Sequence, residues 1–178
     1  WETCMTMNGT WGYKSYDHNY KTPQKLIQNL LDIASKGGNF LLNVGPTAEG
    51  EFPPESIEIL SIMGKWMKVN GETVYGTKAS PWGLFPWGRC TKKETKSGTS
   101  LYFSVFEWPA DSKLVIPGEK NSVLSAKLLA NGVKVKAILT KDGNLTISLP
   151  ATAPDPLVSV IRVDVRGKLA NQAVQPAK

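Results

Sequence analysis

Two segments in the first half of the chain place apolar residues three and four positions apart. The first follows Thr22-Pro23, ends at Gly37-Gly38 and has apolar residues at Leu26, Ile27, Leu30, Leu31, Ile33 and Ala34. This spacing predicts a helix with one wide apolar face. Threonine before proline is typical of a helix start, and glycine of a helix end. A second helix is predicted over about 54–69, closed by Asn70-Gly71, with inward-facing residues Ile57, Leu60, Met63, Trp66 and Met67.

Each predicted helix is preceded by a short run that predicts a β-strand. Residues 1–7 suit one strand. Residues 40–44 are almost continuously apolar between turn signals, which is typical of a strand covered on both faces in a parallel sheet. The order strand, loop, helix, strand, loop, helix describes two βα units. In (β/α)8 barrels the chemistry lies in the loops after the strands, which here are residues 8–21 and 45–53.

Beyond residue 80 the pattern changes to short β-type runs separated by glycine, proline and asparagine. Asp142-Gly143 is a typical hairpin turn, and strands are predicted near 99–107, 113–116, 123–129, 133–139, 144–149 and 157–165. Several short strands at this spacing favour a β-sandwich. We therefore predict an α/β part followed by an all-β part. Residues 1–78 hold the βα units, 79–167 an antiparallel β-sandwich and 168–178 a polar tail.

Composition narrows the classes of function. The chain has 178 residues, with 21 Lys and Arg against 15 Asp and Glu. The positive surplus is scattered, and its densest cluster, Lys92, Lys93 and Lys96, is interpreted as a solvated loop. We therefore expect no nucleic-acid binding. No apolar run approaches the roughly 20 residues that span a bilayer, so we expect no membrane insertion. The two cysteines, Cys4 and Cys90, are either free or joined in one disulfide.

The opening stretch WETCMTMNGTWGY holds a carboxylate, Glu2, among aromatic side chains. Apolar surroundings raise the pKa of a carboxyl group, which a general acid needs near neutral pH. The alternative is a glutamate in solvent. Trp11 and Tyr13, on the loop after the strand, are candidate platforms for the apolar face of a sugar. They would serve equally well as a hydrophobic plug that holds the loop to the body of the protein.

Two polar residues complete the candidates. Asn43 lies inside an apolar strand, where its amide either points at a substrate or hydrogen-bonds the backbone of a neighbouring loop. His18 is either a simple loop residue or a substrate contact. Because it is the only histidine in the sequence, we expect no His-rich metal site and no Ser-His-Asp triad. The sequence predicts no metal and no cofactor.

Three blocks, WETCMTMNGTWGY, KGGNFLLNVGPTAEGEFPP and GKWMKVNGETVYGT, together resemble the α-L-fucosidases of glycoside hydrolase family 29. They occur in the family's order with family-like separations and cover about residues 1–85. The β-rich remainder agrees with the family's C-terminal domain. The resemblance implies a (β/α)8-type catalytic barrel followed by a β-sandwich. This chain would hold the last two βα units of that barrel and the C-terminal antiparallel sandwich.

The resemblance also implies retaining hydrolysis of terminal α-L-fucose by two carboxylates. The glutamate of the family's WE pair maps onto Glu2 as the acid/base, with Trp11, Tyr13 and Asn43 as substrate-binding candidates. No position here matches the family's nucleophilic aspartate. We expect a fragment that is inactive without the N-terminal part of the barrel. Its substrate would be a fucosylated oligosaccharide or glycoprotein glycan, and the family favours a periplasmic, secreted or lysosomal location.

Two non-catalytic interpretations concern the β-sandwich. It could be a carbohydrate-binding module with exposed stacking surfaces on Trp82, Trp87 and Trp108, or a structural module that supports the barrel. We favour the structural role, because the stretch PWGLFPW lies at the junction between the two parts. Tryptophans at such junctions usually pack.

Overall fold

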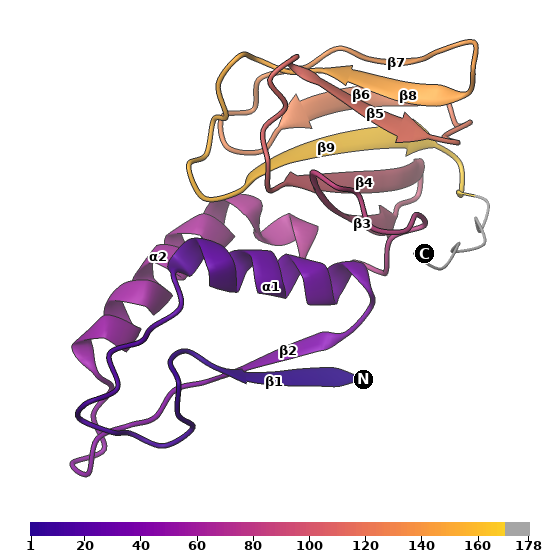
Figure 1. Cartoon of the computed structure of the whole chain (residues 1–178). Helices are drawn as coiled ribbons and strands as arrows, with labels where there is room; N and C mark the ends of the chain where they lie inside the picture. Colours follow the sequence, from indigo (N-terminus) through magenta and orange to yellow (C-terminus); the bar gives the residue numbers. More distant parts are fainter. Residues whose placement is uncertain (170–178) are drawn as a thin grey trace.

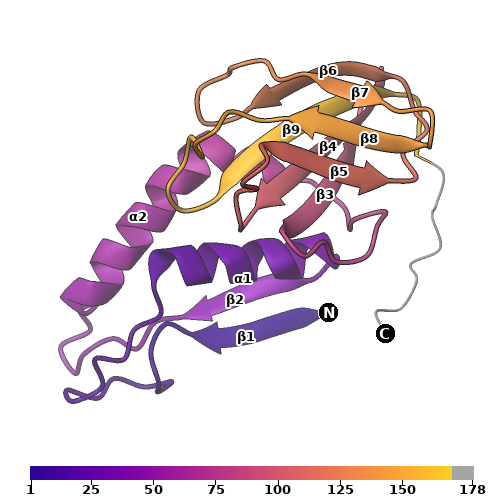
Figure 2. The same ribbon diagram turned by 45° about the horizontal axis from the view of Figure 1, so that its top comes forward.

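The first part of the chain consists of two parallel strands and two helices that lie against one another (Figures 1 and 2). The computed structural model describes residues 1–169, so the predicted polar tail lies outside the described residues from position 170 onward. The elements are β1 (Glu2–Thr6), α1 (Pro23–Ser35), β2 (Asn39–Asn43), α2 (Pro54–Asn70) and the 3-10 helix η1 (Gly71–Thr73). The predicted order of strands and helices is confirmed.

Helix α1 begins and ends where its sequence predicts. The side chain of Thr22 caps the helix by accepting a hydrogen bond from the backbone N–H of Lys25, and Pro23 is its first residue. After the helix, Gly37 has a φ of 78°, which favours glycine. The N–H groups of Gly37 and Gly38 bond the last carbonyls of the helix. These two signals fix where the chain turns back toward β2.

Strands β1 and β2 pair in parallel, from Glu2 opposite Asn39 to Thr6 opposite Asn43. One face of the pair packs on the helices through Met5, Leu42 and Val44. The other face is open: Cys4 is exposed and Leu41 is 45% exposed. The prediction that strand 40–44 is covered on both faces is therefore wrong within residues 1–169, because no second layer lies on this face there.

Helix α2 turns most of its predicted inward-facing residues toward the core: Met63 and Trp66 are buried, and Leu60 and Met67 are partly buried. The buried residues are Ser56, Ile59, Met63, Trp66 and Asn70. The inward placement of Ile57 is wrong: its side chain is 54% exposed, because it lies two positions, about 200°, away from Ile59 around the helix. Helix α2 ends at Asn70 with Gly71 as its C-cap, as predicted, and Gly71 keeps a helical conformation that leads directly into η1. No helix among residues 1–169 is long and apolar enough to cross a membrane.

The second part is a sandwich of two antiparallel sheets. The sheet nearer the helices has the strand order β3-β4-β9-β6, and the outer sheet has the order β5-β8-β7. Their bounds are β3 (Gly88–Glu94), β4 (Gly98–Val105), β5 (Lys113–Pro117), β6 (Val123–Leu128), β7 (Ala137–Leu139), β8 (Asn144–Ser148) and β9 (Ser159–Arg166). Alternate residues of both sheets fill one core, centred on Leu101, Phe103, Leu145, Ile147 and Ile161. The predicted sandwich is confirmed.

Strand β3 is absent from the sequence prediction. Its second half contains Lys92, Lys93 and Glu94, which were interpreted as a solvated loop. In the structure these residues pair with β4. The buried residues of β3 are Gly88 at its start and Cys90 and Thr91 in its middle. Charged side chains at the exposed end of an edge strand hide its apolar alternation, and they also protect the edge from pairing with other chains.

Both cysteines are free thiols. Cys4 is exposed on β1, and Cys90 is buried in the sandwich core. Burial raises the pKa of the Cys90 thiol, so this thiol stays protonated at neutral pH.

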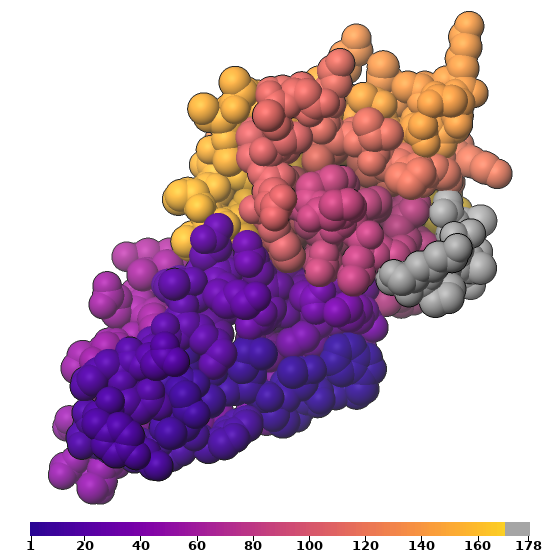
Figure 3. Space-filling view, viewed as in Figure 1, coloured from indigo at the N-terminus to yellow at the C-terminus, as the bar shows by residue number. Residues whose placement is uncertain are grey.

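The helices and the inner sheet share a second apolar core. It joins Met7, Leu26 and Trp66 of the first part to Tyr102 and Val160 of the sheet. The Trp66 indole N–H also donates to the backbone carbonyl of Val158, 2.9 Å away. In Figure 3 the two parts meet along a continuous boundary. The inner sheet is thus covered on both faces, by the outer sheet and by the helices.

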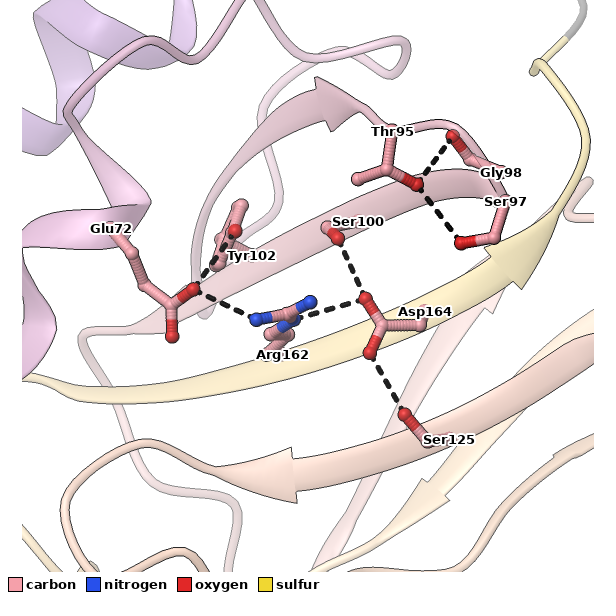
Figure 4. Close-up of polar contacts among 9 residues, drawn as sticks. All are labelled: Glu72, Thr95, Ser97, Gly98, Ser100, Tyr102, Ser125, Arg162 and Asp164. Atoms are coloured by element: carbon pink, nitrogen blue, oxygen red, sulfur yellow. Dashed lines mark hydrogen bonds and ion pairs between the residues drawn. The ribbon is translucent and has the colours of Figure 1, made fainter.

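Polar contacts continue this boundary beyond the apolar core (Figure 4). Glu72 of η1 accepts a hydrogen bond from the Tyr102 hydroxyl at 3.1 Å and pairs with Arg162 of β9 at 3.0 Å. Arg162 also binds Asp164, which accepts hydrogen bonds from Ser100 and from a serine on β6. Burial alone would raise the pKa of Asp164, but these hydrogen bonds lower it. The carboxylate therefore stays charged and the network holds η1 to three strands.

Candidate functional site

The candidate site lies where β1 and β2 end, because the two loops that follow these strands meet there. The first loop runs from the end of β1 to α1 and the second from the end of β2 to α2 (Figure 1). The N–H of Met7 donates to the carbonyl of Asn43 at 3.2 Å, so the two chains stay paired as they leave the strands. Both loops therefore begin from one fixed edge.

Asp17 organises the first loop. Its carboxylate accepts hydrogen bonds from the N–H of Gly9 and the hydroxyl of Thr10, both at 2.9 Å, and from the N–H of Asn19 at 3.2 Å. The bond from Thr10 is the main cause that lowers the pKa of Asp17. A charged carboxylate at neutral pH thus ties the two halves of the loop together.

Lys21 closes the same loop at its base. Its ammonium group donates to the carbonyls of Thr6 and Asn8, at 2.8 and 3.1 Å. Its own N–H bonds the carbonyl of Met7. The loop is therefore a preorganised structure held by side chains at both ends, although it has no regular secondary structure.

Asn43 joins the first loop to β2. Its side-chain amide donates to the carbonyl of Trp11 at 2.7 Å and lies 3.5 Å from the hydroxyl of Thr6. Of the two roles that the sequence left open for this residue, the structure contains the contact with a neighbouring loop. A direct substrate contact by Asn43 stays a prediction.

Gly45 lets the two loops touch. A Cβ atom at this position would lie 2.7 Å from the backbone nitrogen of Tyr13 and 2.9 Å from the carbonyl carbon of Gly12. Real Cβ atoms do not come so close to backbone, so only glycine fits. The contact fixes the stretch that carries the two aromatic candidates.

Trp11 and Tyr13 present open ring surface. Their exposed fractions are 57% and 46%. The alternative of a hydrophobic plug is therefore incomplete within residues 1–169, because about half of each side chain is not packed. Their positions are set by backbone contacts to Asn43 and Gly45 instead. Such rings are available to stack on a ligand.

Glu2 lies at the other end of β1. It is the first residue of the strand, so at about 3.3 Å per residue it is about 13 Å from Thr6 at the carboxyl end. Its side chain is exposed and shares the open face with Cys4, whose thiol lies 3.8 Å from a Glu2 carboxylate oxygen. The structure thus brings Trp11, Tyr13 and Asn43 together and leaves Glu2 apart from them.

Next to Glu2, the ring of Trp1 packs flat against the chain after α1. A Cβ atom on Gly38 would lie 2.5 Å from atoms of the Trp1 ring. Trp1 is still 64% exposed. The aromatic side chain that precedes Glu2 in the chain is therefore itself mostly open to solvent.

Sequence reasoning missed Asp17 and Lys21 because their roles depend on pairing across the loop. Each looks like an ordinary polar loop residue, and its partners are backbone groups that the sequence does not identify. The described residues contain no group of three His, Cys, Asp or Glu side chains that could hold a metal ion. The chemistry available at the carboxyl ends of the strands is hydrogen bonding and stacking.

The sandwich tryptophans lack the open faces that a carbohydrate-binding module would need. Trp82 is only 8% exposed, and its indole N–H donates to the carbonyl of Pro117. Trp87 is partly buried and stacks on Phe85 with ring centres 4.6 Å apart. Trp108 is also partly buried and donates to a backbone carbonyl. The prediction of an exposed Trp82 is wrong, because the junction folds this side chain into the core.

Comparison with known proteins gives the same family as the sequence blocks. Residues 1–72 match the family model described as alpha-L-fucosidase. An alpha-L-fucosidase of Dictyostelium discoideum is 34% identical over 92% of this chain. Alpha-L-fucosidase isoenzyme 1 from Paenibacillus thiaminolyticus matches 93% of the chain with a TM-score of 0.82 and 34% identity.

A solved structure from Bacteroides thetaiotaomicron is also similar, with a TM-score of 0.83 and 31% identity over 94% of this chain. It is described as a trapped covalent intermediate of a family 29 alpha-L-fucosidase, formed with 2-fluoro-fucosyl fluoride in a glutamate-to-glutamine mutant. The chain spans about two-fifths of each of these relatives: 38% of the Dictyostelium protein, 40% of the Paenibacillus chain and 38% of the Bacteroides chain.

Proposed function

We propose that this chain, which belongs to the α-L-fucosidases of glycoside hydrolase family 29, is part of a retaining enzyme that removes terminal α-L-fucose. The observation that carries the proposal is the extent of the similarity. It runs through both the βα part and the sandwich, over more than nine-tenths of the chain. The substrate would be a fucosylated oligosaccharide or a glycoprotein glycan.

We further propose that residues 1–78 belong to a (β/α)8-type barrel and residues 79–167 to a supporting sandwich. Two features support the barrel. The parallel pair of β1 and β2 has no further strand on either edge within residues 1–169. Its open face carries Cys4 and Leu41, side chains that a closed barrel would bury. The buried Trp82 and the partly buried Trp87 and Trp108 support a structural rather than a glycan-binding role for the sandwich.

In this proposal Glu2 is the acid/base. It would protonate the glycosidic oxygen as fucose passes to an aspartate nucleophile, and then deprotonate the water that releases fucose. No residue in this sequence matches that aspartate, so the chain alone should be inactive. The covalent intermediate trapped in a glutamate-to-glutamine mutant of the Bacteroides relative supports a glutamate in this role.

The position of Glu2 sets a condition on this role. Barrel enzymes bind their substrates at the carboxyl ends of the strands, and Glu2 is at the amino end of β1. The catalytic centre must therefore extend down the open face of β1 to its first residue.

Replacing Glu2 with glutamine in the complete enzyme tests the assignment. A fluoride leaving group needs no protonation, so α-L-fucosyl fluoride should still form the covalent intermediate, which mass spectrometry would detect as it accumulates. Azide needs no base, so it should restore turnover and give α-L-fucosyl azide. Hydrolysis of a fucoside with a poor leaving group should fall by about 10²-fold or more.

The matched control is Glu51→Gln, which removes an exposed carboxylate from the loop after β2. It should leave the rates of reaction with the fluoride, of turnover with azide and of fucoside hydrolysis within about twofold of those of the unaltered enzyme. Equal losses on every substrate without azide rescue would show that Glu2 is structural. Full activity of the glutamine variant would remove it from the mechanism. Turnover by residues 1–178 alone would contradict the missing nucleophile.

A further inference from the structure

A cavity of about 320 Å³ lies in the sandwich part of the chain, apart from the loops after β1 and β2. Its walls are residues 118–121 after β5, Pro81 and Trp82 at the junction between the two parts, and Leu169 beyond β9. Among the described residues, Glu119 is the only acidic one in these walls. Its carboxylate therefore decides much of the ligand chemistry that the cavity offers.

The Glu119 carboxylate is buried with one of its two oxygens unpaired. The residue is only 1% exposed. Its Oε1 accepts a hydrogen bond from the N–H of Asn121 at 2.6 Å, whereas Oε2 is buried without a hydrogen-bond partner within residues 1–169. Lys120 is exposed and does not supply this donor. Because an unpaired buried carboxylate oxygen is costly, Oε2 marks a position that a hydrogen-bond donor would fill.

The loop that carries this carboxylate is held at both ends. The N–H of Gly118 donates to the carbonyl of Gly143 at 3.0 Å, and the φ of 72° at Gly118 favours glycine. The side-chain amide of Asn121 donates to the carbonyls of Arg166 and Lys168, at 2.7 and 3.2 Å. These contacts hold the carboxylate in the cavity wall.

The other walls favour a ligand that combines a positive charge with a carbon chain. Pro81 and Trp82 are buried, and Leu169 is partly buried against the sandwich core. The indole N–H of Trp82 is already bonded to the carbonyl of Pro117 at 2.8 Å, so the ring offers carbon atoms rather than a donor. Aromatic rings attract cations, and an ammonium group has the N–H donors that a carboxylate accepts. Burial raises the pKa of Glu119, but a bound cation favours the charged form.

We propose that this cavity binds an alkylammonium ion, whose ammonium group donates to Oε2 of Glu119 and whose carbon chain lies against Trp82 and Leu169. The site is separate from the proposed fucosidase function and does not depend on it. The carboxylate selects a positive charge with N–H donors, and the apolar walls select a carbon chain. Neither an uncharged alcohol nor a cation without N–H groups satisfies both.

The test titrates residues 1–178 with n-butylammonium chloride at pH 8, against sodium chloride at the same ionic strength, and follows the indole N–H signal of Trp82 by NMR. This signal should shift saturably, because Trp82 forms part of the wall. n-Butanol has the same shape without the charge, and tetramethylammonium has the charge without an N–H donor. Each should bind more weakly than n-butylammonium by about tenfold or more.

Glu119→Gln keeps the shape of the side chain but removes its charge, so n-butylammonium should bind this variant more weakly by about tenfold or more. The matched control is Glu107→Gln, which removes an exposed carboxylate from the sandwich part outside the cavity. It should leave binding unchanged.

The proposal would be overturned by the absence of a saturable shift, or by equally tight binding of n-butanol or tetramethylammonium. Equally tight binding of n-butylammonium by Glu119→Gln would overturn it as well. Should the glutamine variant fail to fold, the comparison of the three ligands on the unaltered chain still decides the question. None of these outcomes bears on the fucosidase function.

Discussion

At Gly45 the loops after β1 and β2 come into direct backbone contact. Replacing Gly45 with alanine adds one methyl group and tests how much this contact contributes to stability. The Cβ of Gly45→Ala would lie 2.7 Å from the nitrogen of Tyr13. The neighbour is backbone rather than a flexible side chain, so the loop must move. We expect a loss of about 1–3 kcal/mol in the free energy of unfolding, measured by urea denaturation of the chain.

The matched control is Gly64→Ala in α2, where a Cβ would meet nothing within 4 Å. Alanine is the better helix former, so this change should stabilise the chain by about 0.5–1 kcal/mol. We therefore expect the two glycine-to-alanine substitutions to change the free energy of unfolding in opposite directions. A Gly45→Ala variant as stable as the parent would show that the loops separate easily and that Trp11 and Tyr13 are not held in place.

At the scale of elements, α1 is attached to β3 by an ion pair that stability measurements can isolate. Asp32 of α1 pairs with Arg89 of β3 and with Lys36, and its side chain is mostly buried. Burial alone would raise the pKa of Asp32, but the hydrogen bonds from Lys36 and Arg89 lower it below its usual value. The carboxylate is therefore better stabilised in the folded chain than in the unfolded one.

The lowered pKa of Asp32 sets the expected pH dependence. The stabilisation is fully present above the unfolded pKa of about 3.9 and is lost as the pH falls through the lower folded pKa. Asp32→Asn should cost about 1–3 kcal/mol at pH 7, and the difference between parent and variant should begin to shrink as the pH falls below about 4. Urea denaturation at pH 7, 5 and 3 measures this difference. The control Glu58→Gln, on an exposed position of α2, should change stability little at any of these pH values.

At the scale of the whole molecule, the helices and the sandwich stabilise each other. The inner sheet and the residue before β9 present Tyr102, Val160 and Val158 to the helices, and these residues are at most 2% exposed in residues 1–169. Residues 79–178 alone would expose them and would leave Arg162 without Glu72. We expect the melting temperature of residues 79–178 to be lower than that of residues 1–178 by about 4–8 °C or more.

Calorimetry of both chains checks this prediction, with binding of a hydrophobic dye as the second measurement. The separate sandwich should bind the dye more strongly because its helix-facing surface is apolar. Equal melting temperatures and equal dye binding would show that the sandwich is independent. That outcome would also reopen the view of the sandwich as a separate module.

Local signals in the sequence determined the elements with clear caps and clear periodicity. Thr22-Pro23 and Gly37-Gly38 bound α1 because they act within one helical turn. Alternating apolar residues located most strands of the sandwich for the same reason. Strand β3 was missed and Ile57 was misplaced because charges and neighbouring segments, rather than local pattern, decide which side chains are buried there.

The sequence by itself also placed Trp11, Tyr13 and Asn43 near the ends of two strands and identified the family. Only the tertiary structure decided that the Asn43 side chain holds the Trp11 loop and that Gly45 lets the two loops touch. These facts depend on contacts between residues far apart in the chain. A strand has two ends and two faces, and packing rather than the order of residues determines which of them share a site.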